Sequence, residues 1–209
     1  MGGYDPYSSS KGCAELVAAA YRSSYFNIER HGDHGVGLAT ARAGNVIGGG
    51  DWAADRLIPD MVRAVSKNEP VKIRRPNAIR PWQHVLEPLA GYLTLAQHLY
   101  LSNTLASTAF NFGPRDEDAK SVINIAEHFT SAWGDGASWV QDVNQHPHEA
   151  QYLKLDCSKA KALLGWRPQM DLNQALDYVV QWHKAHIAGD NMRQKSLQQI
   201  SHFMALCKE

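Results

Sequence analysis

Apolar residues recur along the chain at two spacings, which predict helices alternating with short strands. Asp5 and Pro6 are typical of a helix start, and the apolar residues beyond them predict a long helix from residue 6 to about residue 26. Further helices are predicted at 55–68, around 89–99, after a cap at Ser121, from a cap at Asp156 to a stop at Gly165, and at 172–187 and 192–207. Short strands are predicted at 36–42, 71–74, 108–112 and 139–143.

Composition narrows the class of protein. The chain has 209 residues, of which 44% are hydrophobic and 20% charged, so it is long enough for a globular core. Its formal net charge of zero argues against nucleic acid as a partner. Three cysteines without disulfide or metal spacing suit a reducing compartment, and no apolar run approaches the ~18 residues of a membrane span. We therefore expect a cytoplasmic, globular chain with no membrane segment and no signal peptide.

Tyr7 and Lys11 are the strongest candidates for chemistry. They are four residues apart on the first predicted helix, so their side chains share one face. A phenol ionises near pH ~10, but an ammonium at ~5 Å favours the phenolate by at most ~3 kcal/mol at an effective dielectric of ~20. This would bring Tyr7 towards the working range of a general acid or base. The alternative is a surface ring beside a solvated lysine, a pair that many helices carry by chance.

Three other stretches carry polar or glycine-rich patterns. The glycines at 48–50 follow a predicted strand and allow close backbone approach, or form a flexible turn; they are not a dinucleotide fingerprint. Arg80 precedes an aromatic segment and suits phosphate oxygens, although such arginines often lie on solvated edges. His146, His148 and Glu149 cluster but lack a third spaced ligand, so a loop is favoured over a metal site and no metal is expected.

The residues around Tyr7 decide between these alternatives by resemblance. The stretch Gly3-Tyr4-Asp5-Pro6-Tyr7-Ser8-Ser9-Ser10-Lys11-Gly12 resembles the active-site helix of the extended short-chain dehydrogenase/reductases, in particular of their nucleotide-sugar 4,6-dehydratases. A second signature is Asp156-Cys157-Ser158-Lys159, followed by Leu164-Gly165-Trp166-Arg167-Pro168, in which Trp166 is expected to be packed rather than catalytic.

The resemblance implies an α/β fold. It would be the C-terminal part of a Rossmann-like parallel sheet with a smaller α/β substrate-binding domain. Residues 1–50 would belong to the NAD-binding Rossmann domain without its N-terminal half. Residues 51–209 would be mainly the sugar-nucleotide-binding domain, with some strands returning to the Rossmann sheet. No glycine-rich strand–turn–helix unit for a dinucleotide precedes Tyr7, so we expect the C-terminal part of such an enzyme.

The same resemblance implies roles for individual residues. Tyr7 and Lys11 would be catalytic, and NAD would be held by Tyr7, Lys11 and Ala43. The substrate-binding residues would be Asn45, Arg56, Arg80, Asn111 and Glu149. The chain departs from the family at Pro81, where an aspartate is commoner, and at His146, where an arginine is expected.

Arg80-Pro81-Trp82-Gln83-His84 resembles the branch of the family that uses CDP-glucose. The implied activity is the NAD-dependent conversion of CDP-glucose to CDP-4-dehydro-6-deoxy-glucose, a lyase reaction of deoxysugar and O-antigen biosynthesis, in a homo-oligomer. The alternatives are another epimerase or dehydratase of the family, and a non-catalytic remnant that binds sugar nucleotide. We expect the isolated chain to bind no NAD, to be inactive and to aggregate, because strand edges and apolar faces would lie open.

Overall fold

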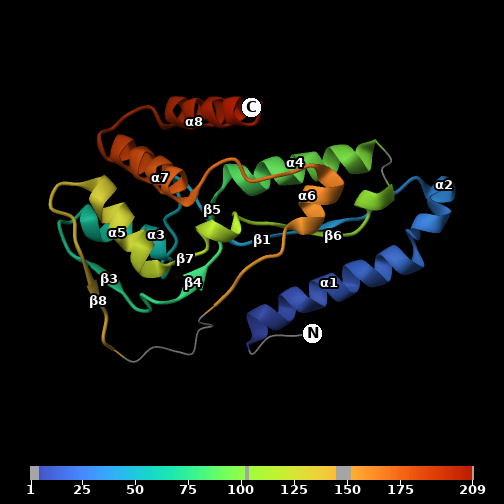
Figure 1. The fold of residues 1–209 in the computed structure, drawn as a ribbon, viewed down its shortest axis with the longest axis horizontal. Coiled ribbons are helices and arrows are strands. Elements are labelled where there is room, and N and C mark those ends of the chain that lie inside the picture. Colours follow the sequence, from blue (N-terminus) through green and yellow to red (C-terminus); the bar gives the residue numbers. More distant parts are fainter. Residues whose placement is uncertain (1–4, 102–103, 145–151, 209) are drawn as a thin grey trace. The chain divides into compact units, whose positions relative to one another are not determined.

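The computed structural model describes residues 5–101, 104–144 and 152–208 (Figure 1). The chain divides into two compact units. Unit 1 is drawn from Met1–Arg42, Ala90–Phe112 and Asp156–Arg167. Unit 2 is drawn from Ala43–Leu89, Gly113–Leu155 and Pro168–Glu209. Each unit therefore combines segments that are far apart in the sequence.

Unit 1 is built around one strand pair and several helices. Strand β1 (Thr40–Ala43) pairs with β6 (Ala109–Phe112). The helical elements are α1 (Pro6–Ser24), η1 (Ile28–Arg30), α2 (His31–His34), most of α4 (Leu86–Tyr100), η2 (Thr104–Ala106) and α6 (Ser158–Leu164).

The predicted start of α1 is confirmed. Asp5 is the N-cap, and its carboxylate accepts a hydrogen bond from the Ser8 backbone N–H at 3.0 Å, while the Asp5 N–H donates to the Ser8 hydroxyl at 3.4 Å. Pro6 occupies the first turn, where its missing N–H costs nothing. This reciprocal capping satisfies donors that every helix leaves unpaired.

The strand predicted at 36–42 is wrong over its first half, since β1 begins only at Thr40. Side chains bind the backbone before that point. The Val36 N–H donates to His34 Nδ1 at 3.0 Å, and the Ser107 hydroxyl contacts both the N–H and the carbonyl of Leu38 at 3.0 Å. Backbone groups that are bonded to side chains in this way are not available for a ladder.

Unit 2 contains three strand pairs flanked by helices. Its strands are β2 (Asn45–Ile47), β3 (Val71–Ile73), β4 (Ile79–Arg80), β5 (Trp82–His84), β7 (Lys120–Ser121) and β8 (Trp139–Gln141). β2 pairs with β5 and β3 with β8 in parallel, whereas β4 pairs with β7 antiparallel. Its helical elements are α3 (Leu57–Val65), η3 (Asp116–Asp118), α5 (Val122–Trp133), α7 (Leu172–Ile187) and α8 (Met192–Leu206). The expected α/β class is confirmed, whereas strand β2, directly before the glycines at 48–50, was not predicted.

One continuous apolar core fills unit 2. Helices α5 and α7 pack against each other, and α3 and β3 pack on the same cluster (Figure 1). The core includes six residues with 0% exposure: Met61, Ile125, Ala126, Phe129, Leu176 and Val179. Three of these, Ile125, Ala126 and Phe129, recur at helical spacing along α5 and so share its inner face.

Two predicted helix caps are corrected. Ser121 stands at the N-cap position of α5, but its hydroxyl donates to the Asn124 side chain at 2.7 Å instead of capping the backbone. Helix α6 has Cys157 as its N-cap, and Asp156, one residue earlier, accepts from the Ser158 N–H at 2.8 Å. Gly165 ends α6 at φ +66° as predicted, because glycine adopts the left-handed region freely.

Trp166 is packed in unit 1, as expected. It is 6% exposed, and its ring meets Phe112 edge to face with centroids 5.0 Å apart. None of the helices within the described residues is both long and apolar enough to cross a bilayer.

Candidate functional site

Tyr7 and Lys11 lie on the first half of α1, one turn apart. The Lys11 Nζ stands 5.3 Å from the centroid of the Tyr7 ring, so the ammonium lies over the ring face. The Tyr7 side chain is 70% exposed and Lys11 is also exposed. The two groups are therefore accessible to a ligand, and the Lys11 ammonium makes a cation–π contact with the Tyr7 ring.

Asn45 is held at the start of β2 by a close approach of two backbones. The Asn45 N–H donates to the Pro81 carbonyl at 3.0 Å, and Asn45 stands opposite Trp82 in the parallel pair. A Cβ built at Gly44 would come within 2.5 Å of the Pro81 carbonyl oxygen, so Gly44 permits this approach. Asn45 is half-buried, and Ala43, at the end of β1, is half-buried too.

Arg80 is a buried arginine rather than one on a solvated edge. It is 6% exposed in β4, and its Nη1 donates to the Ile79 carbonyl at 2.9 Å. A buried guanidinium is uncommon unless its donors are satisfied by partners of the right geometry. Arg80 stands two residues before Trp82, the residue opposite Asn45, so its buried side chain has a fixed position in this part of unit 2.

Arg56 lies at the N-cap of α3 and is exposed. No side chain caps that helix start. Asp55, immediately before it, has φ +59° and forms an ion pair with Arg74 at 2.8 Å. The exposed Arg56 guanidinium thus stands at a helix N-terminus, which carries a partial positive charge, while the carboxylates of Asp55 and Asp60 are paired with other arginines.

Asn111 lies in β6 of unit 1. Its Nδ2 donates to the Asp156 carbonyl at 2.9 Å, and its Oδ1 is buried with no hydrogen-bond partner among the described residues. Glu149 and His146, the predicted ribose carboxylate and the replacement for the arginine, lie outside the described residues.

The predicted residues thus fall into two groups. Tyr7, Lys11 and Asn111 belong to unit 1, whereas Ala43, Asn45, Arg56 and Arg80 belong to unit 2. Asn45 and Arg80 are brought close through the β2–β5 pair, because Arg80 is followed directly by Pro81 and Trp82. Within the described residues, no group of three or more potential ligands could hold a metal ion.

Two buried ionisable groups that follow Arg80 within seven residues along the chain were given no role from the sequence. His84 is 3% exposed, and burial lowers its pKa to about 4, so it is neutral at pH 7. Glu87 is 1% exposed and accepts from the backbone N–H groups of Gln169 (2.9 Å) and Met170 (2.7 Å), while burial raises its pKa to about 7. The available signal was their position in and directly after Arg80-Pro81-Trp82-Gln83-His84, the stretch already noted for its resemblance.

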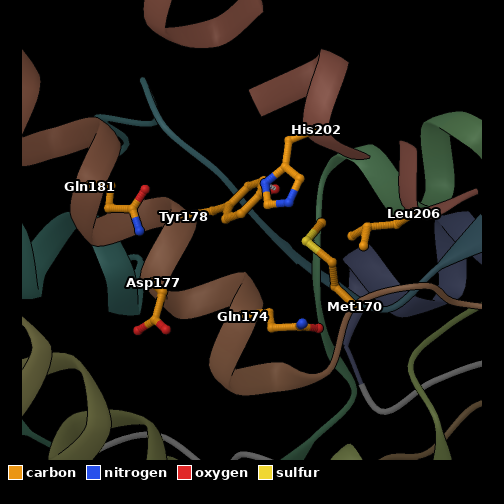
Figure 2. Close-up of a pocket in the computed structure, with 7 residues that line it drawn as sticks. All are labelled: Met170, Gln174, Asp177, Tyr178, Gln181, His202 and Leu206. Carbon is orange, nitrogen blue, oxygen red and sulfur yellow. Dashed lines mark hydrogen bonds between the residues drawn. The ribbon is translucent and has the colours of Figure 1, made fainter. Parts of the chain in front are cut away.

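A small hollow lies between α7 and α8 of unit 2 (Figure 2). Its volume is about 130 Å³, and its lining residues are Met170, Gln174, Asp177, Tyr178, Gln181, His202 and Leu206. The Tyr178 hydroxyl lies 2.6 Å from His202 Nδ1 within it. None of the sequence-predicted site residues lines this hollow, so it lends no support to their roles.

Comparison with solved structures gives the class of fold. The chain matches a dTDP-glucose 4,6-dehydratase from Bacillus anthracis in complex with NAD, with a TM-score of 0.67 and 21% identity over 88% of this chain and 53% of that one. It also matches a UDP-glucuronic acid 4-epimerase from Bacillus cereus in complex with UDP-glucuronic acid and NAD, with a TM-score of 0.71 and 17% identity over 86% and 52%. Both likenesses place this chain in the Rossmann-type α/β class.

Sequence comparison gives the family. The model of the GDP-mannose 4,6 dehydratase family matches residues 2–179, and the chain belongs to this family. It is 59% identical over 205 residues to the CDP-glucose 4,6-dehydratase of Salmonella typhimurium, covering 98% of this chain and 57% of that protein. The chain therefore spans little more than half the length of the relatives it matches.

Proposed function

We propose that this chain serves the NAD-dependent dehydration of CDP-glucose to CDP-4-dehydro-6-deoxy-glucose. The observation that carries the proposal is the 59% identity, over nearly the whole chain, to a CDP-glucose 4,6-dehydratase. The accessible Tyr7–Lys11 pair supplies the matching chemistry, since the Lys11 Nζ stands 5.3 Å from the Tyr7 ring centroid.

Tyr7 acts as the proton acceptor in the first step. Its phenolate oxygen takes the proton of the sugar C4 hydroxyl as that carbon is oxidised to a ketone. The ketone acidifies the C5 hydrogen, and loss of that proton and of the C6 hydroxyl releases water. Tyr7 and Lys11 account for the oxidation; the elimination requires a further base and acid to which we assign no residue of this chain.

The residues of this chain are chemically suited to hold the nicotinamide ribose of NAD. The exposed Tyr7 hydroxyl and Lys11 ammonium form a donor set suited to the ribose hydroxyls next to the nicotinamide, and Ala43 is a further proposed cofactor-binding residue. When bound, NAD would supply the hydride acceptor for C4 and the hydride donor for C6, and a proton added at C5 completes the 4-dehydro-6-deoxy product. The glycine-rich turn that holds a dinucleotide pyrophosphate has no counterpart in this sequence, so these residues contribute part of the cofactor site.

The substrate roles remain proposals for individual residues. Arg80 and Asn111 would bind the pyrophosphate, and Asn45 the sugar. Arg56 would contribute a charge at the uncapped start of α3, where anions are favoured. Glu149 would bind the nucleotide ribose.

We also propose that residues 1–50 form part of the cofactor domain and that residues 51–209 form mainly the substrate domain. The whole protein would be a cytoplasmic homo-oligomer serving deoxysugar and O-antigen synthesis.

The test is a chimera in which this chain replaces the 205 matched residues of the Salmonella enzyme. The chimera should convert CDP-glucose to the 4-dehydro-6-deoxy product, identified by mass spectrometry. Turnover of UDP-, dTDP- or GDP-sugars instead would assign the chain to another member of the family. A correctly folded chimera without turnover of any nucleotide sugar would indicate a non-catalytic remnant.

Calorimetry on the same chimera tests the base preference. CDP should bind more tightly than UDP or dTDP, because Arg80-Pro81-Trp82-Gln83-His84 matches the CDP-glucose branch. Equal affinities for the three nucleotides would contradict this preference and leave the wider reaction class intact.

A further inference from the structure

The backbone of Gly49 lies directly on the indole ring of Trp182. A Cβ built at Gly49 would stand 2.1 Å from Trp182 Cγ and 2.2 Å from Cδ2, distances at which no side-chain carbon fits. Gly49 is not among the residues with positive φ, so glycine is needed there for the close approach rather than for the backbone angle. A Cβ built at the next residue, Gly50, would stand 3.4 Å from Cη2 at the far end of the same ring, which is ordinary van der Waals contact.

Trp182 is itself fixed in place. Its Nε1 donates to the Ser196 hydroxyl of α8 at 3.0 Å, and its ring stacks on His186 with an interplanar angle of 9°. Trp52, two residues after Gly50, contacts the rings of His183 and His186 at 5.0 and 5.2 Å between centroids. Gly49 therefore rests on Trp182 of α7, and Trp52 rests on His183 and His186 of the same helix. Helix α8 supports the first contact through Ser196.

The loop of residues 48–56 is also held by hydrogen bonds and an ion pair between Trp52 and the start of α3. Arg63 of α3 donates to the carbonyls of Trp52 at 3.0 Å and of Ala53 at 3.2 Å. Asp55 is held by Arg74 at 2.8 Å, and Arg56 follows as the N-cap of α3. Loop 48–56 thus joins Asn45 of β2 to Arg56, and its path is set by contacts with α7, α3 and Arg74.

We propose that Trp182 is a positioning residue for nucleotide-sugar binding. It acts through loop 48–56, keeping Arg56 and the end of β2 in the arrangement that receives the substrate. The identity of the ligand rests on the proposed function, whereas the coupling between Trp182 and the loop follows from the packing at Gly49. A purely structural tryptophan would affect stability without changing substrate affinity.

The experiment uses the active chimera and a double-mutant cycle. Trp182→Ala removes the support, and Gly49→Ala pushes the loop off the ring, so each should raise the KM for CDP-glucose about tenfold with kcat changed by less than about threefold. In the double variant the added methyl no longer meets the ring. Gly49→Ala should then raise KM by less than about twofold when it is introduced into Trp182→Ala.

Two matched variants complete the set. Trp182→Phe keeps a ring under Gly49 and should retain a KM within about threefold of the unsubstituted chimera. Trp139 is half-buried like Trp182, but it packs against the core from β8. Trp139→Ala should therefore lower Tm without raising KM.

The outcomes separate this proposal from the function on which it rests. An unsubstituted chimera without nucleotide-sugar turnover contradicts the proposed function, and the positioning claim is then read from amide hydrogen exchange of residues 48–56. This exchange should accelerate in Trp182→Ala and stay unchanged in Trp139→Ala. An unchanged KM in Trp182→Ala, additive effects in the double variant, or equal loop exchange in the two tryptophan variants would overturn the positioning role.

Discussion

Helices α1 and α7 begin alike and end up in different surroundings. Both start at an aspartate N-cap with a capping box: Asp5 with Ser8, and Asp171 with Gln174. Helix α1 has 19 residues, none of them buried, and α7 has 16, of which seven are buried. On α1, Leu16, Val17 and Tyr21 are each at least half exposed, whereas Leu176 of α7 is fully buried.

The difference in burial gives the two helices different roles: α1 carries the proposed chemistry, and α7 contributes to stability. The exposed face of α1 carries the proposed catalytic pair, so substitutions there should affect turnover more than folding. The inner face of α7 belongs to the core of unit 2 and contacts the loop that leads to Arg56. Changes on α7 should therefore act on stability or on substrate binding.

The largest expected effect comes from Tyr7→Phe in the chimera. This substitution removes the proton-transferring hydroxyl and leaves an exposed ring, so turnover should fall by about 10²–10⁴ while Tm and CDP affinity change little. Steady-state kinetics, thermal unfolding and calorimetry would measure the three quantities. Normal turnover in the Phe variant would show that Tyr7 is a surface residue without a catalytic role.

A matched pair of leucines tests the burial difference directly. Leu176→Ala on α7 removes a fully buried side chain and should lower the free energy of unfolding by about 2–5 kcal/mol. Leu16→Ala on α1, where the side chain is 50% exposed, should cost less than about 1 kcal/mol. Urea unfolding of both variants provides the measurement, and similar losses would mean that α1 is covered in solution.

Buried ionisable groups in unit 2 predict how stability depends on pH. Burial lowers the pKa values of His84 and His183 from 6.5 to about 4, so below pH 6.5 the unfolded chain binds more protons at these sites and stability falls. Burial raises the pKa of Glu87 from 4.5 to about 7, so between these values the folded chain binds the extra proton and stability rises as the pH falls. The net loss from these three groups between pH 6.5 and pH 4.5 should be about 1 kcal/mol per pH unit.

Glu87→Gln should remove the opposing contribution and about double that slope, since only the two histidines then respond. Urea unfolding followed by tryptophan fluorescence between pH 4.5 and 6.5 would show it. Glu127→Gln, at an exposed position on α5, is the control and should keep the original slope. Equal slopes in the two variants would contradict the buried protonation of Glu87.

The smallest effect concerns the helix starts. Asp5→Ala and Asp171→Ala each remove a carboxylate that accepts a backbone N–H, from Ser8 and from Gln174. Exchange of these two amide hydrogens should accelerate about fivefold in each case, because the cap is a local interaction. Asn at either position keeps the acceptor and should restore the original rate, whereas a response on one helix alone would show that the two caps are not equivalent.

The features that could be predicted from the sequence are those that depend on residues close together in the chain. The start of α1, the glycine that ends α6, and the inward face of α5 follow from caps, backbone conformation and helical spacing. The first half of the strand predicted at 36–42 was wrong because side chains bind its backbone. One of them, Ser107, is 69 residues from Leu38, so no local pattern could reveal the contact. Strand β2 was missed because its partner β5 is also remote in the sequence and because glycines flank the stretch on both sides.

For the candidate site, the sequence alone determined which residue types stand at family positions, including Tyr7, Lys11, Asn45 and Arg80. The four-residue spacing of the first two also determined that they share a helix face, since helical geometry is local. Only the tertiary structure decided that Arg80 and Glu87 are buried, that Asn45 pairs beside Pro81, and that Gly49 rests on Trp182. Burial and close packing depend on segments that meet only when the chain folds, and no periodicity within one segment encodes them.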